Sequence, residues 1–282
     1  SGTVIFTQGF NSLFAEWQTT DEAKYIEKAF EGSVRFPYPK YPFLLTFYKR
    51  SGYHSDSVIF KTLIDPNDFL IEKRDPESVE IRDIQVYGHP SGKVDLVFLA
   101  EGYTGNEMEK FLLDVHRFTD SLFSQQAFKK NKKKFNVRAV LSVSEDNGPD
   151  NPGIDVWQNT ILNTGFYTFG SERYLTTRSY WKVCDIAAAV PYDHIIILVN
   201  STKYGGGGIY NHYSLSSAGN ELSEIVFVHE LGHGLAGLGD EYYTSDVAYS
   251  DYYDLNKEPV EPNLTTLVDF DVKWKTLISP GV

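Results

Sequence analysis

The pattern of hydrophobic and polar positions changes near residue 85 of this 282-residue chain. Before that point, short apolar runs alternate with prolines and turn residues, a pattern that favours β-strands. These runs are residues 34–36, 43–48, 58–63 and 69–72. Only residues 15–30 have helical character in this part. We therefore predict a β-rich N-terminal domain over residues 1–84, with the architecture of a β-sandwich, ending before a turn-rich joint at residues 88–92.

From residue 94 onward the pattern is that of an α/β domain, which we assign to residues 85–282. Residues 94–100 form a nearly continuous apolar run of strand length, and residues 135–143 and 194–199 form similar runs. A capping box and apolar residues at helical spacing lie between the first two runs, namely Thr104, Glu107, Met108, Phe111, Leu112, Val115 and Phe118. The chain as a whole is therefore expected to be an α+β protein.

Four consecutive glycines at residues 205–208 follow the third of these strands. They lack the sequence context of a phosphate-binding loop, so a flexible rim or a close approach of two backbones is the better interpretation. Residues 209–217 alternate in polarity and predict a short strand. Asn220 then has the position of an N-cap for a helix over residues 221–236.

Residues 229–233 of this predicted helix read His-Glu-Leu-Gly-His. On a helix, His229 and His233 lie one turn apart on the same face. Two imidazoles in this arrangement can bind one Zn2+, and Glu230 then lies beside the metal as a base. The pattern therefore predicts a zinc-dependent hydrolase, and within that class a peptidase, with Glu230 as its general base.

A catalytic zinc ion has three protein ligands and an open position for water, so one ligand must come from beyond the helix. Gly237 is a natural helix terminator, and the acidic pair Asp240 and Glu241 follows it. We favour Asp240 as the third ligand. Glu241 is the alternative ligand, or a residue that holds a ligand histidine from behind.

The same region offers several groups that could donate a hydrogen bond to a developing oxyanion. Tyr242, Tyr243, Tyr210 and His212 are the candidates, and the sequence does not choose among them. The strand at residues 210–217 could also form the edge on which an extended peptide pairs by strand addition.

Composition narrows the range of partners. The net charge of −12, from 38 acidic and 26 basic residues, argues against a nucleic-acid partner. No apolar run reaches the roughly 18 residues of a membrane span. Cys184 is the only cysteine, so an internal disulfide is excluded, and its apolar surroundings favour a core residue over a nucleophile. The lysine-rich residues 129–134 are interpreted as a solvated helix end.

Four stretches resemble the IgA-peptidase family of zinc metallopeptidases from gut-type bacteria. They are V-F-V-H-E-L-G-H-G-L-A-G-L-G-D-E-Y-Y at 226–243, residues 94–103, residues 204–210 and residues 261–265. The resemblance covers roughly residues 85–275. It implies a metzincin-like catalytic domain that acts on a protein or peptide, with Glu230 catalytic and His229 and His233 on zinc. It also implies a secreted, periplasmic or cell-surface protein whose targeting segment is absent from this chain.

The chain departs from the usual metzincin pattern in two respects. Gly237 and Asp240 each come one residue later than in that pattern, and the only methionine is Met108, so no methionine turn follows the motif. The chain ends 49 residues after His233 (282 − 233), and we expect a C-terminal segment to be missing. The alternatives are a non-catalytic surface binding module on a peptidase fold and an inactive truncated form. The oligomeric state is left open.

Overall fold

The computed structural model describes residues 2–52, 55–73, 78–241 and 253–279 of the chain. The chain divides into two compact units. The first consists of Ser1–Val34 and Pro76–Ala236, and the second of Arg35–Asp75 and Gly237–Val282. The N-terminal segment and residues 76–236 therefore form one unit, and the domain boundary at residue 84 stays a prediction.

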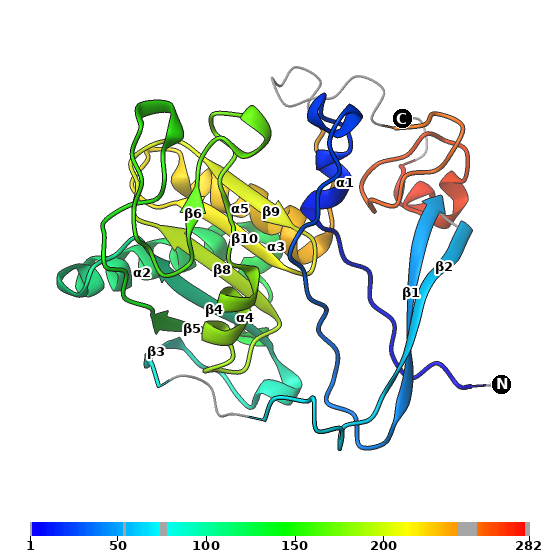
Figure 1. Ribbon diagram of the computed structural model, residues 1–282, viewed down its shortest axis with the longest axis horizontal. Helices are drawn as coiled ribbons and strands as arrows, with labels where there is room; N and C mark the ends of the chain where they lie inside the picture. Colours follow the sequence, from blue (N-terminus) through cyan, green and yellow to red (C-terminus); the bar gives the residue numbers. More distant parts are fainter. Residues whose placement is uncertain (1, 53–54, 74–77, 242–252, 280–282) are drawn as a thin grey trace. The chain divides into compact units, whose positions relative to one another are not determined.

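The first unit is built around a six-stranded mixed sheet with the strand order β3-β5-β4-β8-β10-β9 (Figure 1). Its strands are β3 (Glu80–Gln85), β4 (Val94–Glu101), β5 (Phe135–Leu141), β8 (His194–Val199), β9 (Gly206–Ile209) and β10 (Tyr213–Ser217). The inner strands run parallel, and the edge strands β3 and β9 are antiparallel to their neighbours. The predictions of strands near β4, β5 and β8 are confirmed.

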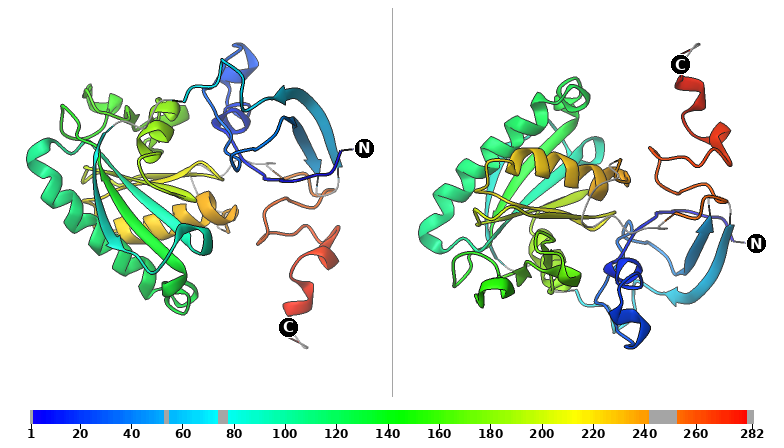
Figure 2. Two further views of the ribbon diagram at one scale, coloured as in Figure 1. Left: turned by 90° about the horizontal axis from the view of Figure 1, so that it is seen from below. Right: turned by 90° about the horizontal axis from the view of Figure 1, so that it is seen from above.

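Helices cover both faces of this sheet. The longer segments are α2 (Met108–Ser124), α4 (Tyr180–Ala187) and α5 (Ser223–Ala236), and the shorter ones are η2 (Pro90–Gly92), η3 (Gly105–Glu107), α3 (Gln126–Lys129), η4 (Lys132–Lys134), η5 (Pro152–Ile154) and η6 (Thr168–Gly170). Figure 2 shows α2 and α5 on one face and α4 on the other. A two-stranded sheet, β6 (Thr164–Gly165) with β7 (Thr176–Thr177), lies in the connection before α4.

Alternation along the strands separates two hydrophobic cores. Even-numbered residues of β4 and β8, such as Phe98 and Ile196, pack with α2 and α5. Odd-numbered residues of the same two strands, such as Val97 and Ile195, pack with α4. On β5 the parity is reversed, because side chains alternate between the faces within each strand separately. On β10, odd-numbered Tyr213 belongs to the α4 side, so the even-numbered residues face α5.

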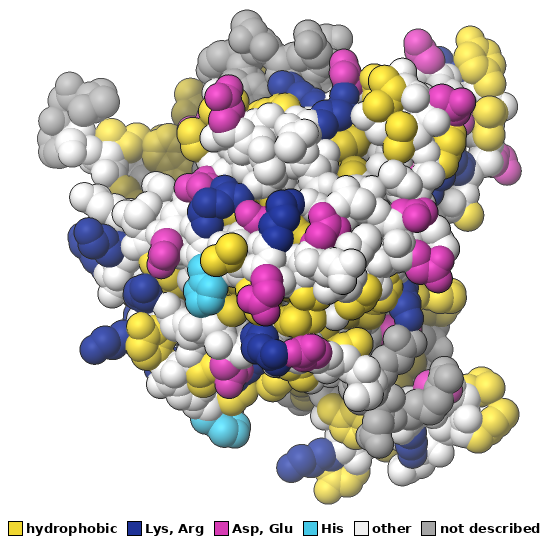
Figure 3. Space-filling model, turned by 90° about the vertical axis from the view of Figure 1, so that its left-hand side faces the viewer, with side chains coloured by type: hydrophobic (Ala, Val, Ile, Leu, Met, Phe, Trp, Pro, Cys, Tyr) yellow, Lys and Arg dark blue, Asp and Glu magenta, His cyan; other side chains and the backbone are white. Residues whose placement is uncertain are grey.

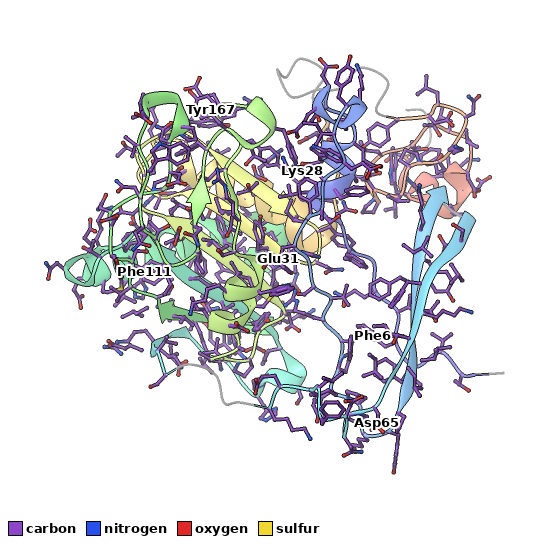
Figure 4. The ribbon with its side chains drawn as sticks, viewed as in Figure 1. Phe6, Lys28, Glu31, Asp65, Phe111 and Tyr167 are labelled. Atoms are coloured by element: carbon purple, nitrogen blue, oxygen red, sulfur yellow. The ribbon has the colours of Figure 1, made fainter. Side chains whose placement is uncertain are left out.

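The capping box predicted before α2 is present. The backbone N–H and the Oγ1 of Thr104 donate to Glu107 Oε2 at 3.0 and 2.9 Å. The helix then buries its apolar side, including Phe111, which points into the core (Figure 4). The lysine-rich segment after α2 forms short helical turns. On the face of the molecule shown in Figure 3, basic and acidic side chains are interspersed with one another.

A buried carboxylate fixes the long loop after β5. Glu101 is fully buried at the end of β4, and its oxygens accept four hydrogen bonds at 2.6 to 2.9 Å. The donors are Thr160 Oγ1, Leu162 N, Thr164 N and Thr164 Oγ1. Burial raises the pKa of Glu101, while these hydrogen bonds act in the opposite direction. The side chain therefore ties the loop to the sheet next to the carboxyl end of a central strand.

The N-terminal segment belongs to the first unit. It contains only a short helix and a turn, α1 (Leu13–Trp17) and η1 (Glu22–Lys24). Asn11 N–H donates to Tyr210 O at 3.2 Å, at the turn that follows β9. Glu31 lies beside α4, where it accepts a hydrogen bond from the Trp181 backbone N–H at 2.5 Å (Figure 4). The segment is thus attached to the sheet at more than one place.

The second unit contains an antiparallel hairpin and short helical turns. Its elements are β1 (Phe43–Gly52), β2 (Ser55–Ile64), η7 (Phe270–Val272) and η8 (Lys275–Leu277). A buried ammonium group organises the C-terminal part. Lys273 Nζ donates to the carbonyl oxygens of Pro259, Glu261 and Leu264 and lies 3.3 Å from Glu258 Oε1.

Several expectations for the secondary structure were wrong. The helical character expected for residues 15–30 is found only as far as Lys24, in α1 and η1. Residues 209–217 are not one strand, because residues 210–212 form the turn between β9 and β10. The β-sandwich predicted within residues 1–84 is not confirmed, since only β1 and β2 pair with each other in its described part and β3 joins the large sheet. Among the described helices, none has the length and hydropathy to cross a membrane.

Candidate metal centre

Helix α5 carries the His-Glu-Leu-Gly-His motif, and its start is fixed by the predicted cap. Asn220 Oδ1 accepts from Leu222 N–H at 3.0 Å, and Asn220 N–H donates to Ser223 Oγ at 2.9 Å. The apolar side of the helix then enters the core through Phe227 and Leu231, which are each 1% exposed. Burial of these two side chains fixes the rotation of the helix, so His229, Glu230 and His233 project from its other sides.

The two motif histidines converge as the sequence predicts. His229 is exposed and His233 is half-buried. Their Nε2 atoms lie 2.9 Å apart, and the two rings are almost perpendicular, at 89°. Two nitrogens bound to one tetrahedral zinc ion, each at about 2.1 Å, would lie about 3.4 Å apart. A separation near this value, with both Nε2 atoms directed to the same place, fits a shared metal ion.

The carboxylate of Glu230 lies over the glycines of the edge strand β9. A Cβ atom on Gly206 would be 2.9 Å from Glu230 Oε1, and one on Gly208 would be 3.1 Å from Oε2. A Cβ on Gly208 would also lie 2.5 Å from the Glu230 backbone oxygen and 2.9 Å from His233 Cβ. Real Cβ atoms essentially never make contacts shorter than 3.0 Å, and three of these four distances are below that value. The prediction that the glycine run permits a close approach of two backbones is therefore confirmed.

The edge of the sheet is β9, not the strand that the sequence suggested. We expected residues 210–217 to form an open edge, but β10 pairs with β8 on one side and β9 on the other. The outer side of β9 begins at Gly206, whose carbonyl accepts from Leu175 N–H at 3.1 Å. Just beyond its other end, the carbonyl of Tyr210 accepts from Asn11.

Two buried polar side chains beneath α5 escaped the sequence analysis. Ser214 on β10 and His194 on β8 are 0% and 1% exposed. Ser214 Oγ donates to the Glu230 backbone oxygen at 2.9 Å, and His194 Nε2 lies 2.8 Å from Ser214 Oγ. A Cβ on Gly234 would overlap Ser214 Oγ. The only available sequence signal was Gly234 itself, a glycine inside a helix.

The candidates for the third ligand lie in the second unit, after the end of α5. Gly237 has a φ of +63°, the left-handed conformation of a helix terminator. Asn263 holds the segment that follows, because its Oδ1 accepts from Gly239 N–H at 2.9 Å and its Nδ2 donates to Gly239 O at 2.8 Å. The same Nδ2 donates to Glu241 Oε1 at 2.8 Å. Asp240 lies between these anchored residues and is exposed.

The oxyanion candidates lie in different environments. Tyr210 is half-buried in the turn after β9. His212 is only 5% exposed, and its ring stacks with Tyr180 at 4.5 Å and Phe10 at 5.9 Å. This enclosure places His212 in the protein interior rather than on an open surface. Tyr242 and Tyr243 lie outside the described residues. An oxyanion role for any of these residues stays a prediction.

A polar pocket of about 420 Å³ lies at the carboxyl ends of β4 and β8, and no residue of α5 lines it. Glu107 and Lys110 contribute its charged groups. Burial opposes ionisation of Glu107, but hydrogen bonds from Thr104, Asn147 and Asn200 outweigh it and lower its pKa to about 2. Because these groups hydrogen-bond to one another, we regard the pocket as a structural polar cluster separate from the histidine pair.

Comparison with known proteins adds two findings. Residues 82–282 match the family model described as IgA Peptidase M64. Residues 1–61 match the model for the peptidase M64 N-terminus. A comparison with curated proteins gave no match. The first match alone covers more than half of the chain and contains α5, Asp240 and Asn263.

Proposed function

Since the chain belongs to the family of IgA peptidases M64, we propose that it is a zinc-dependent endopeptidase that hydrolyses peptide bonds of extracellular proteins. Membership makes the protein a peptidase, and thus a hydrolase. The single observation that supports the zinc-dependent type is the convergence of His229 Nε2 and His233 Nε2 at 2.9 Å, with Glu230 between them in the sequence.

We assign the metal to His229, His233 and Asp240, each of which offers one ligand atom. Asp240 follows the last residue of α5 by four positions, and four residues span at most about 14 Å, so its carboxylate stays within reach of the helix end. Glu241 remains the alternative ligand. One of its carboxylate oxygens, Oε1, accepts from Asn263 Nδ2 at 2.8 Å.

Glu230 is proposed as the general base. A zinc ion bound at this centre supplies Lewis acidity, which polarises the scissile carbonyl and lowers the pKa of a water molecule. Glu230 takes the proton from the attacking water and later delivers it to the departing amine. Its position over the glycines of β9 keeps the carboxylate in one place, because the adjacent backbone leaves it little room to move.

The substrate chain is proposed to lie along β9. Backbone bonds already exist at Gly206 and at Tyr210, and the stretch between them lies beside Glu230. An extended peptide that pairs there by strand addition brings its carbonyl groups next to the motif helix. An extracellular, periplasmic or cell-surface location is part of the proposal, and it rests on the sequence resemblance alone.

The test compares wild-type protein with Glu230→Gln on immunoglobulin A and on casein, with cleavage followed by mass spectrometry. We expect about one zinc per chain in both proteins, and a fall in kcat of at least 10²-fold in the variant. Glu221→Gln is the matched control, because Glu221 is exposed and precedes the same helix. Equal cleavage by wild type and Glu230→Gln contradicts the proposal. Zinc without any cleavage by the wild type would favour the alternative of a binding module.

A further inference from the structure

The buried pair His194 and Ser214 has no role in the reaction as proposed above, yet it contacts the backbone of the proposed general base. We infer that these two side chains are positioning residues for Glu230, and that they act through a hydrogen-bond chain of fixed direction. The chain runs from His194 Nε2–H to Ser214 Oγ, and from Ser214 Oγ–H to the carbonyl oxygen of Glu230. This inference rests on the proposed role of Glu230.

The sheet explains why both side chains point at α5. His194 and Ser214 occupy even-numbered positions of the neighbouring parallel strands β8 and β10. Even-numbered residues of β8, such as Ile196, face α2 and α5, and odd-numbered residues of β10, such as Tyr213, face α4. Ser214 and His194 therefore occupy positions at which the alternation of side chains along the strands predicts apolar residues. Two buried polar groups are costly unless they are hydrogen-bonded, which argues that their bonds are specific.

The direction of the two hydrogen bonds follows from the last acceptor in the series. The Glu230 backbone oxygen can only accept, so the single hydroxyl proton of Ser214 is committed to the 2.9 Å bond to it. Ser214 Oγ must then accept across the 2.8 Å contact, so His194 Nε2 carries a proton. Hydrogen bonds in series polarise one another, which strengthens the bond that reaches the helix.

The anchor lies on the turn of α5 that carries the motif. A helical carbonyl normally accepts one bond, from the N–H four residues later, and the carbonyl of Glu230 accepts an additional one from Ser214. Gly234 makes this possible, since a Cβ there would overlap Ser214 Oγ and lie 2.8 Å from His194 Cε1. Asn211 N–H donates to Gly234 O at 2.9 Å and anchors the following turn. These contacts thus fix the distance between α5 and the sheet next to Glu230.

Ser216 provides a matched control. It lies two residues further along β10, on the same face, and is 1% exposed. Its hydroxyl contacts the carbonyl of Ser223 at 3.4 Å, at the start of α5 and far from the motif turn. Ser214→Ala and Ser216→Ala therefore remove the same group from the same face of one strand. Only the first change removes a contact with Glu230.

The kinetic test measures kcat, KM and zinc content of the full chain. We expect Ser214→Ala to lower kcat about tenfold, with KM changed less than twofold and zinc content unchanged, because a small displacement of a catalytic group costs rate rather than binding. Ser216→Ala should keep wild-type kcat. Equal kcat values for both variants and wild type overturn the inference, as does a loss in Ser214→Ala that appears only in KM.

A second measurement does not depend on activity. Nitrogen-15 NMR of the histidine rings should show His194 with a proton on Nε2 that exchanges slowly with water, in zinc-free and zinc-loaded protein. In Ser214→Ala that proton should exchange at least tenfold faster. A His194 ring with a bare Nε2 in the wild type overturns the inference. If the wild type has no peptidase activity while these NMR results hold, the proposed function fails and the hydrogen-bond chain stands.

Discussion

Gly208→Ala is the most direct test of the contact between β9 and the motif helix. The substitution adds one methyl group to the edge strand at a position where the backbone φ is not in the left-handed region. Strain in the strand itself is therefore not expected. The new carbon would lie 2.5 Å from the Glu230 backbone oxygen and 2.9 Å from His233 Cβ. Both neighbours belong to the proposed site.

The magnitude follows from these distances. Non-bonded carbon contacts have their optimum near 3.5 Å, so the strand and the helix must separate by about 1 Å. Overpacking of this kind costs roughly 1–3 kcal/mol of folding free energy. A misplacement of about 1 Å at a reacting group lowers the rate by about 10²-fold. Activity should consequently fall far more than the folded fraction at ambient temperature.

The assay combines urea unfolding with kcat/KM on a peptide substrate. Gly92→Ala is the control, because a Cβ at Gly92 meets no atom within 4 Å. That variant should stay within about 0.5 kcal/mol of wild-type stability and keep full activity. Wild-type activity and stability in Gly208→Ala would refute the claim that the glycine strand sets the position of Glu230 and His233.

Three further predictions concern the surrounding structure. The pKa of Glu107 is about 2, below its usual 4.5, so its ionised form stabilises the fold above pH 4.5 and this contribution is lost as the pH falls towards 2; Glu107→Gln should be less stable than wild type at pH 6, and urea unfolding should show the difference shrinking by pH 3. Glu101→Gln places an amide NH2 against the N–H of Leu162 or of Thr164, so thermal unfolding should report a loss of about 1–3 kcal/mol. Asn263→Ala removes the hydrogen bonds that hold the segment carrying Asp240, so competition with a chelator should show zinc affinity lowered about 10- to 100-fold. The helical signal in circular dichroism should stay unchanged. An unchanged zinc affinity would show that this segment does not contribute to metal binding.

Local patterns were sufficient to predict the motif helix, with its end at Ala236 and a start two residues before the observed Ser223. The spacing of His229 and His233 fixes their common face, and Asn220 and Gly237 mark the ends of α5 by capping chemistry that acts within a few residues. The capping box at Thr104 was predictable for the same reason. Interactions between residues that are close in sequence can be predicted from the sequence alone.

Pairing between distant strands was not predictable in this way. Residues 209–217 alternate in polarity across the turn at 210–212, so the alternation alone did not reveal a hairpin. The edge position of β9 depends on strand order, which is set by long-range packing. His194 and Ser214 are 20 residues apart in sequence. Their relation to Glu230 appears only when β8 and β10 are placed side by side.

The N-terminal segment shows a second limit. The helical character predicted there is limited to two short pieces, and residues 2–34 join the first unit mainly through loops and single hydrogen bonds such as that of Asn11 to Tyr210. Residues 15–30 lacked the continuous apolar face that keeps a helix intact. Tertiary contacts, not local propensity, determine the path of this segment.

The central claim is that α5 and the segment after it hold one catalytic zinc ion. Anomalous diffraction at the zinc edge, from crystals of zinc-loaded protein, tests it most directly. We expect one peak about 2.0–2.2 Å from the Nε2 atoms of His229 and His233 and from a carboxylate oxygen of Asp240, with a water molecule in the fourth position. A peak held by other residues, or no peak beside α5, would contradict it.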